Sequence, residues 1–119
     1  MIANYLPGAF FSFHLEKEGQ IIGINKEILE LFECASSEEF RMITGNCFDG
    51  MVVTEDLDYI KRMFFENQQK YMEENRVLVV DFRIITKNKV QIKVRDYIRF
   101  IDTKDIGLVC SNILLEIPE

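Results

Sequence analysis

A single histidine and three cysteines are the residues of this 119-residue chain whose side chains most often act as nucleophiles, bases or metal ligands. They are His14, Cys34, Cys47 and Cys110, and they lie far apart in the sequence. Their positions form no Ser/His/Asp or Cys/His arrangement that argues for an activated nucleophile. An odd number of widely spaced cysteines matches neither a disulfide framework nor a paired metal site. We therefore interpret the cysteines as reduced, mostly buried thiols, and we expect no catalytic residues and no enzymatic activity.

Four acidic residues near the middle of the chain are the other group that could bind a metal ion. They are Asp49, Glu55, Asp56 and Asp58. Carboxylates are common in the first turn of a helix, because the helix dipole favours negative charge there, and Thr54 is a residue type that caps helices. We prefer a solvated first helical turn to a divalent-metal site, and we predict no metal ligands.

Asp96 interrupts the apolar face of a predicted strand. Val94 and Ile98 flank it at the strand period of two, so the face that they share also holds the carboxylate. A buried unpaired carboxylate is costly, and one explanation is that Asp96 contacts a polar group in a ligand cavity. The other explanation, which we prefer, is a β-bulge that turns Asp96 to solvent beside Arg95 or Arg99.

Hydrophobic periodicity predicts the strands that position these residues. Residues 76–117 contain three apolar runs separated by polar turns at 86–89 and 102–105, which indicates an antiparallel meander. The first two runs alternate apolar and polar residues, as half-buried strands do. In the turn between them, Asn88 is expected to take a positive φ. In the third run, 108–117, both the odd-numbered and the even-numbered positions are mostly apolar. This strand is therefore predicted to be central and covered on both faces.

The first 75 residues are predicted to supply two more strands and the helices that cover the sheet. Alternation predicts strands at 9–15 and 20–24, and residues 46–53 are predicted to be a loop or a single turn. Capping signals predict two short helices and one long helix that ends near Asn75, and the signals are Asn25, Ser36 with Glu39, Gly45, and Thr54. The predicted fold is therefore α+β, a five-stranded antiparallel sheet with a helical cap. The space between cap and sheet is a natural ligand cavity.

Composition limits the partners of the chain. The net charge is −6, and Lys and Arg alternate with acidic residues, which argues against binding to nucleic acid and to anionic membrane surfaces. No apolar run approaches the roughly 20 residues that span a bilayer, and the N-terminus lacks the pattern of a signal peptide. We expect a soluble, cytoplasmic protein with one domain over residues 1–119.

Several short motifs, in their order and spacing, resemble a PAS domain of the bacterial type found upstream of GGDEF (diguanylate cyclase) signalling domains. They cover nearly the whole chain, and none is diagnostic alone. They are Leu6-Pro7-Gly8-Ala9-Phe10-Phe11, Ile24-Asn25, Leu31-Phe32-Glu33-Cys34 followed by Glu38-Glu39-Phe40, Thr44-Gly45-Asn46 with Gly50-Met51-Val52, Glu55-Asp56-Leu57, and Phe82-Arg83-Ile84.

Two motifs depart from the pattern of that family. The family commonly has His-Pro before the Glu-Asp pair, where this chain has Val53 and Thr54. Members often end in Asp-Ile-Thr, where the last strand meets a linker helix, and this chain has Glu116-Ile117-Pro118. We expect the domain to be excised from a longer signalling protein, whose catalytic part lies elsewhere.

The resemblance leaves the cofactor unknown. Asn46-Cys47-Phe48 is similar to the Asn-Cys-Arg-Phe of light-sensing LOV domains, in which a cysteine adds to a flavin, but the arginine is missing. Haem sensors of the family usually take their axial ligand from the long helix, whereas His14 lies in the first predicted strand. Flavin and haem are therefore disfavoured, and we interpret Cys47 as a buried or half-exposed thiol and His14 as a surface residue.

The resemblance implies a sensory or signal-relay domain that binds a small ligand or responds through dimer contacts and regulates a C-terminal effector, expected to be a GGDEF diguanylate cyclase. The alternative is a ligand-free interaction module, for example of a histidine kinase, that fills its cavity with its ten phenylalanines and forms a homodimer. Residues predicted to face inward are the candidate ligand-binding residues, and they are Phe48, Met51, Ile60, Phe64, Ile84, Val94, Asp96 and Ser111.

Overall fold

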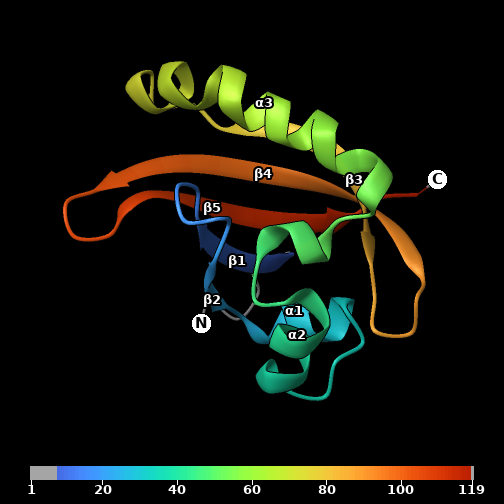
Figure 1. The fold of residues 1–119 in the computed structure, drawn as a ribbon. Helices are drawn as coiled ribbons and strands as arrows, with labels where there is room; N and C mark the ends of the chain where they lie inside the picture. Colours follow the sequence, from blue (N-terminus) through green and yellow to red (C-terminus); the bar gives the residue numbers. More distant parts are fainter. Residues whose placement is uncertain (1–7, 119) are drawn as a thin grey trace, which may run out of the picture.

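The computed structural model describes residues 8–118, in which helices cover one face of an antiparallel sheet (Figure 1). The elements in chain order are β1 (Ala9–His14), β2 (Ile21–Ile24), α1 (Lys26–Leu31), α2 (Ser37–Thr44), the 3-10 segment η2 (Phe48–Met51), α3 (Thr54–Glu73), β3 (Leu78–Ile85), β4 (Gln91–Thr103) and β5 (Gly107–Glu116). The strand order is β2-β1-β5-β4-β3, and all neighbouring strands are antiparallel. The predicted α+β class, the five strands and the order of elements are confirmed.

The two short helices begin at the predicted caps. The Asn25 side chain accepts hydrogen bonds from the backbone N–H of Ile28 (3.1 Å) and from that of Phe10 (2.9 Å). The cap therefore also ties α1 to strand β1. At α2, the Ser36 hydroxyl accepts from the backbone N–H of Glu39 at 3.1 Å. These side chains satisfy N–H groups that a helix start leaves without partners.

The start of α3 differs from the prediction. The helix begins at Thr54, and Val53 occupies the N-cap position without a side-chain hydrogen bond. The Val53 N–H donates to the carbonyl of Arg83 at 2.9 Å, and Val52 pairs with Ile84 as an isolated β-bridge. Contact with β3 therefore fixes where the chain turns into α3, and Thr54 is not the cap that the sequence suggested.

Strand β4 runs through Asp96 without a bulge, so the preferred interpretation of that residue is wrong. Asp96 pairs with Val80 on β3 and with Leu114 on β5, in registers that continue unbroken on both sides. A bulge at this point would disrupt two hydrogen-bonded ladders, because β4 has a neighbour on each edge. The Asp96 side chain consequently faces the helices and is 0% exposed.

Strand β5 is central, as predicted, but its outer face is only partly covered: Val109 is 8% exposed there. Cys110, Asn112 and Leu114 point toward the helices and are buried. On the opposite face Ile113 is 37% exposed, because the helices lie on the other side of the sheet. The prediction of a strand covered on both faces therefore holds only in part for the described residues.

The turn between β3 and β4 places its left-handed residue one position later than predicted. Lys89, and not Asn88, has a positive φ, of 65°. The N–H of Lys89 donates to the carbonyl of Thr86 at 3.0 Å, and the N–H of Thr86 donates to the carbonyl of Val90 at 2.9 Å. A tight turn followed by one left-handed residue is a common hairpin connection.

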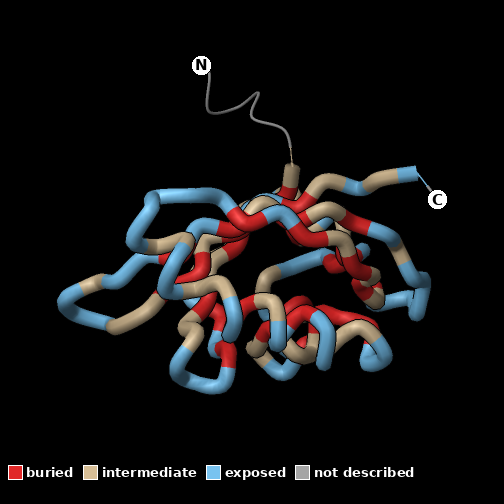
Figure 2. Tube along the Cα trace, turned by 90° about the horizontal axis from the view of Figure 1, so that it is seen from above, coloured by how far each residue is buried: buried red, intermediate tan, exposed pale blue. Residues whose placement is uncertain are grey.

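The core lies between the sheet and the helices. Figure 2 shows the buried segments gathered in the middle of the molecule, with exposed residues at the hairpin tips. Helix α3 packs on β3 and β4, and α1 packs on β1. Within residues 8–118, no helix combines the length and the apolarity that a membrane span requires.

Candidate functional site

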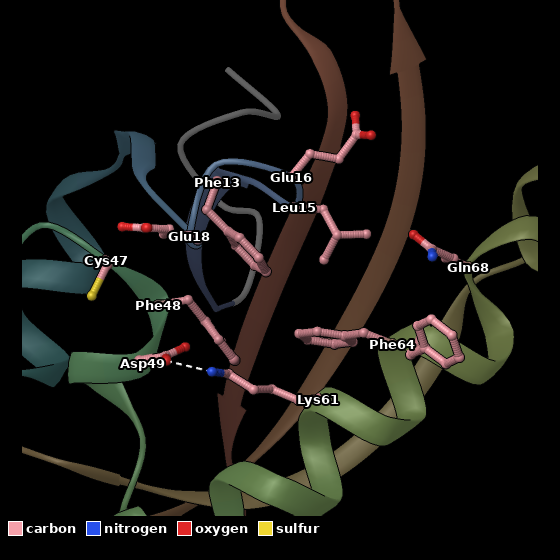
Figure 3. A pocket seen from close by; sticks show the side chains of 12 residues that line it. Phe13, Leu15, Glu16, Glu18, Cys47, Phe48, Asp49, Lys61, Phe64 and Gln68 are labelled. Carbon is pink, nitrogen blue, oxygen red and sulfur yellow. Dashed lines mark hydrogen bonds and ion pairs between the residues drawn. The ribbon is translucent and has the colours of Figure 1, made fainter.

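A cavity of about 570 Å³ opens between the β1–β2 turn, η2 and α3. Figure 3 shows side chains from these three segments directed toward a common space. The residues that line the cavity are Phe13, Leu15, Glu16, Glu18, Gly19, Cys47, Phe48, Asp49, Lys61, Phe64, Phe65 and Gln68. Its volume lies within the range of roughly 300–1,000 Å³ that is typical of small-molecule sites.

Three phenyl rings form the inner end of the cavity. The rings of Phe13 and Phe48 stack with centroids 4.7 Å apart and an interplanar angle of 12°. The ring of Phe64 is tilted against both, at 5.9 Å from Phe13 and 5.4 Å from Phe48. These rings come from β1, η2 and α3, so the inner end is built by every segment that borders the cavity (Figure 3).

Backbone hydrogen bonds hold η2 against the β1–β2 turn. The N–H of Phe48 donates to the carbonyl of Gly19 at 2.9 Å, and Gln20 pairs with Cys47 as an isolated β-bridge. Gly19 has a φ of +74°, which glycine adopts without strain. The turn and η2 therefore position the Phe48 ring together.

Gly50 lets η2 pass close to the end of α2, and we predict that Gly50→Ala destabilises the domain. A Cβ at this position would lie 1.9 Å from the carbonyl oxygen of Thr44, so backbone atoms must shift. We expect a loss of about 3 kcal/mol, at the upper end of overpacking effects, measured by urea unfolding. Gly23→Ala is the control, because its Cβ would lie 3.7 Å from the Ser12 hydroxyl. Equal stabilities of the two variants would contradict the close approach.

The mouth of the cavity is acidic. Glu16, Glu18 and Asp49 line it together with one lysine, Lys61. The Lys61 ammonium lies 2.5 Å from the Asp49 carboxylate (dashed line in Figure 3), and the Glu16 carboxylate accepts from the backbone N–H of Leu108 at 3.2 Å. The lining carries more negative than positive charge, so the mouth attracts cations more than anions.

Two buried polar side chains lie deeper on the sheet, outside the cavity lining. Asp96 of β4 and Asn112 of β5 are both 0% exposed. Neither carboxylate oxygen of Asp96 has a hydrogen-bond partner among the described residues. Asn112 donates to the carbonyl of Cys110 at 3.1 Å, but its side-chain oxygen also has no partner there. Buried polar groups nearly always have partners, so this pair is the principal anomaly of the core.

Burial controls the ionisation of this region. Loss of hydration raises the pKa of the Asp96 carboxyl well above its ordinary value. Burial also raises the pKa of the Cys110 thiol, and the negative charge of an ionised Asp96 raises it further. Asp96 and Cys110 therefore lie close enough to influence each other, and the Cys110 thiol stays protonated and is a poor nucleophile.

The central acidic residues form ion pairs that the sequence did not reveal. Asp56 binds the guanidinium of Arg83, with 2.8 Å between the Asp56 Oδ1 and the Arg83 Nη2, and Asp49 binds Lys61. Within residues 8–118, no group of three or more His, Cys, Asp or Glu side chains is arranged to hold a metal ion. A wholly solvated first turn is thus the wrong description for Asp56.

The predicted ligand-binding residues fall into three groups. Phe48 and Phe64 line the cavity. Ser111 lies on the outer face, paired with the exposed Arg99, so its prediction as an inward-facing residue is wrong. The remaining ones are buried in the core between sheet and helices, and they are Met51, Ile60, Ile84, Val94 and Asp96.

Sequence reasoning missed Asn112 and most of the cavity mouth. Asn112 is the neighbour of Ser111 in a strand whose odd-numbered and even-numbered positions are both mostly apolar. The hydrophobic pattern therefore did not indicate which of the two residues faces inward. Glu16, Glu18 and Lys61 are polar surface residues of a turn and a helix, and only tertiary contacts bring them together.

The histidine and the cysteines lie at separate places. Cys34 and Cys110 are buried, Cys47 is half-buried at the cavity, and the three thiols are not paired with one another. His14 is half-buried on the face of β1 opposite to Phe13, so the expectation of a surface histidine holds only in part.

Comparison with solved structures places this architecture in a known fold. The PAS domain of a protein from Desulfitobacterium hafniense superposes with a TM-score of 0.71 at 10% identity, over 97% of each chain. A PAS domain from a two-component sensor histidine kinase gives 0.64 at 11% identity, over 98% of this chain and 90% of that one. The PAS-B domain of Cycle from Drosophila melanogaster, with bound ethylene glycol, gives 0.65 at 12% identity, over 92% of this chain and 99% of that one.

Sequence comparison adds no relative. No protein-family model matches the chain, and no curated protein sequence matches it. The similarity is therefore one of three-dimensional structure, and it establishes the PAS fold.

Proposed function

We propose that this chain, which has a PAS fold, is the sensory domain of a signalling protein and binds a small molecule in the cavity between the β1–β2 turn, η2 and α3. The observation that carries the proposal is the cavity of about 570 Å³, with an inner end of phenyl rings and a polar mouth. Apolar walls with a few polar groups are the usual composition of small-molecule sites. No residue of the cavity supplies a nucleophile with a base, so the proposed role is binding and not catalysis.

The proposed output passes through the sheet. Phe13 on β1 borders the cavity, and β1 pairs along its length with β5, the last strand. A ligand that favours one arrangement of β1 and β5 over another shifts the equilibrium between them, and it acts only by that difference in affinity. We propose that β5 leads to a C-terminal effector in the same, longer protein. A GGDEF diguanylate cyclase in a bacterial cytoplasm is the effector that the sequence motifs favour.

A second candidate function is a homodimerisation module, favoured by an apolar row on the outer face of the sheet. Phe10, Ile113, Tyr97 and Val79 stand opposite one another across β1, β5, β4 and β3. Phe10, Ile113 and Val79 are each more than a third exposed. Exposed apolar patches mark interaction surfaces, so this row suits a second copy of the chain.

Native mass spectrometry with matched tryptophan variants tests the first proposal. Gln68 lines the cavity and its side chain points into it (Figure 3), whereas its neighbour Gln69 is exposed and donates to Glu73. We expect the wild type and Gln69→Trp to carry an extra non-covalent mass that denaturation releases. Gln68→Trp should lack this mass, because the indole occupies the ligand's space.

The outcomes separate the two candidate functions. An absorbance spectrum of the same sample identifies any chromophore. A bare polypeptide mass for the wild type, with a dimer at micromolar concentration, would exclude a tightly held ligand and favour the dimerisation module. The same extra mass on Gln68→Trp would place the ligand outside the cavity.

A further inference from the structure

Three buried side-chain oxygens without a hydrogen-bond partner among the described residues lie on the inner face of the sheet. They are the two carboxylate oxygens of Asp96 and the side-chain oxygen of Asn112. The side chains of both residues face the helices, from adjacent strands. Asn112 stands opposite Ile98, two positions from Asp96 along β4, so the two polar residues are diagonal neighbours. When Asp96 is ionised, all three oxygens are acceptors, and such a set is complementary to a ligand that brings donors.

We propose that the ligand is an organic amine in its ammonium form, whose N–H groups donate to Asp96 and Asn112. This inference rests on the sensory function proposed above and adds the chemical class of the ligand. An ammonium group has three donors and no acceptor, which matches the three unpaired oxygens. A carboxylate or phosphate ligand would add acceptors to a site that already lacks donors.

Phe48 lines the cavity and also stacks on the cross-strand neighbours of the polar pair. Its ring lies within 4.7–6.0 Å of the rings of Phe11, Phe13, Phe64 and Phe82, so it covers the middle of the inner face. Phe11 pairs directly with Asn112 across β1 and β5, and Phe13 pairs with Cys110. Residues two apart on one face of a strand are roughly 7 Å apart, so Asn112 lies one side-chain layer beyond the cavity.

Entry of the amine therefore requires Phe48 to turn away from Phe13. Phe48 is carried by η2, a four-residue segment whose N–H is held by Gly19 in the β1–β2 turn. Movement of this ring displaces η2 and the turn together. The site then couples ligand entry to β1 and, through its pairing, to β5.

Charge and aromatic surface favour a cation along the whole path. The mouth carries Glu16, Glu18 and Asp49 against Lys61, and the chain has a net charge of −6. The phenyl faces of Phe13 and Phe48 attract ammonium groups through their negative quadrupole faces. The path thus ends at a carboxylate after passing an acidic mouth and aromatic walls.

Binding is expected to release protons. In the free protein burial raises the pKa of the Asp96 carboxyl well above its ordinary value and so favours its protonated form. When the ammonium binds, the carboxyl loses its proton to solvent and the ion pair forms, with no other bond made or broken. Cys110 on β5 is the titratable neighbour, and the buried side chains of η2, α1, α3 and β3 are apolar. The affinity for the amine should therefore rise with pH.

Three probes of similar size and different charge test the inference. They are 2-phenylethylamine, 2-phenylethanol and 3-phenylpropionate, and their dissociation constants are measured by ligand-observed NMR at neutral pH. We expect the wild type to bind the amine at least tenfold more tightly than the alcohol or the acid, as a charge-assisted hydrogen bond supplies. Calorimetry in two buffers of different ionisation enthalpy should show net release of protons when the amine binds.

Three carboxylate variants locate the amine. Asp96→Asn should weaken amine binding about tenfold and abolish proton release. Asp81→Asn is the control, because Asp81 lies on the outer face of β3, paired with Arg95, and it should leave the affinity within about twofold. Asp96→Val serves as a second variant that removes the acceptor with an apolar side chain.

Each alternative result has a definite meaning. Equal or tighter binding of the alcohol or the acid would overturn the amine inference and leave the sensory function standing. Amine binding that Asp96→Asn does not weaken would place the amine at the acidic mouth and also overturn the inference. A wild-type domain that binds none of the three probes and carries no copurified small molecule would refute the sensory function itself.

Discussion

Asp96→Val is expected to stabilise the ligand-free domain by about 1 kcal/mol at pH 4 and by more at pH 7. Asp96 is fully buried and has no hydrogen-bond partner among the described residues. Valine suits a strand position that lies between Val94 and Ile98 on the inner face, opposite Val80 and Leu114. Urea unfolding of the wild type and the variant at both pH values measures the difference.

The pH dependence follows from the direction of the Asp96 pKa shift. In the unfolded chain the carboxyl loses its proton near its ordinary pKa of 3.8, whereas in the fold burial raises the pKa well above that value. Above about pH 4 the unfolded state therefore binds fewer protons than the folded state, and stability falls with rising pH by about 1.4 kcal/mol per unit until the folded pKa is reached. The Asp96→Val variant has no carboxyl group at this position, so its stability lacks this dependence on pH.

Other carboxylates do not obscure the comparison. The pKa of Asp56 is lowered by Arg83 and that of Asp81 by Arg95, so both contribute stability that is lost as the solution becomes more acidic. Both are present in the wild type and in the variant, and the difference between the two proteins isolates Asp96. Parallel stability profiles from pH 4 to pH 8 would show that Asp96 is ionised and stabilised in the fold.

Asp56→Asn is expected to destabilise the domain by about 2 kcal/mol at pH 7. The Asp56 carboxylate accepts three hydrogen bonds from Arg83, from its backbone N–H (2.8 Å), its Nε (3.1 Å) and its Nη2 (2.8 Å). These bonds tie the first turn of α3 to β3, beside the point where the Val53 N–H meets the Arg83 carbonyl. Thermal or urea unfolding measures the loss.

The penalty of Asp56→Asn should shrink in acid. Hydrogen bonds from the Arg83 side chain lower the pKa of Asp56, so its contribution is complete above the ordinary pKa of 3.8 and is lost as the pH falls through the folded value. Asp58→Asn is the control, because Asp58 is an exposed carboxylate two positions further along the same helix. A penalty as large for Asp58→Asn as for Asp56→Asn would mean that the helix dipole, and not the bond to β3, is the source.

Asp56 and Asp96 thus have opposite effects on the stability of the fold, although Asp56 binds the same sheet that contains Asp96. The link between Asp56 and Arg83 holds α3 on β3, whereas Asp96 weakens the same core two strands away from β1. A domain with a destabilising unpaired carboxylate in its core gains stability from any ligand that pairs with that carboxylate.

Local chemistry was enough to predict most of the architecture from the sequence. Period-two alternation identified β3 and β4, and the caps at Asn25 and Ser36 identified the starts of two helices. These signals are short-ranged, because a strand face repeats every two residues and a cap bonds within three or four residues. The start of α3 escaped prediction because a bond to Arg83, and not the Thr54 side chain, defines it.

The sequence by itself determined the α+β order of elements, the central place of β5 and the presence of an acidic residue on an apolar strand. Only the tertiary structure decided that Asp96 faces inward, that Asn112 and not Ser111 joins it, and that the cavity opens beside Phe48. The physical reason is that apolar residues of β5 occupy both odd-numbered and even-numbered positions. The residues of β5 alone therefore do not determine which side of the strand faces the helices. Pairing with β1 and β4 selects the face, and that pairing joins residues distant in sequence.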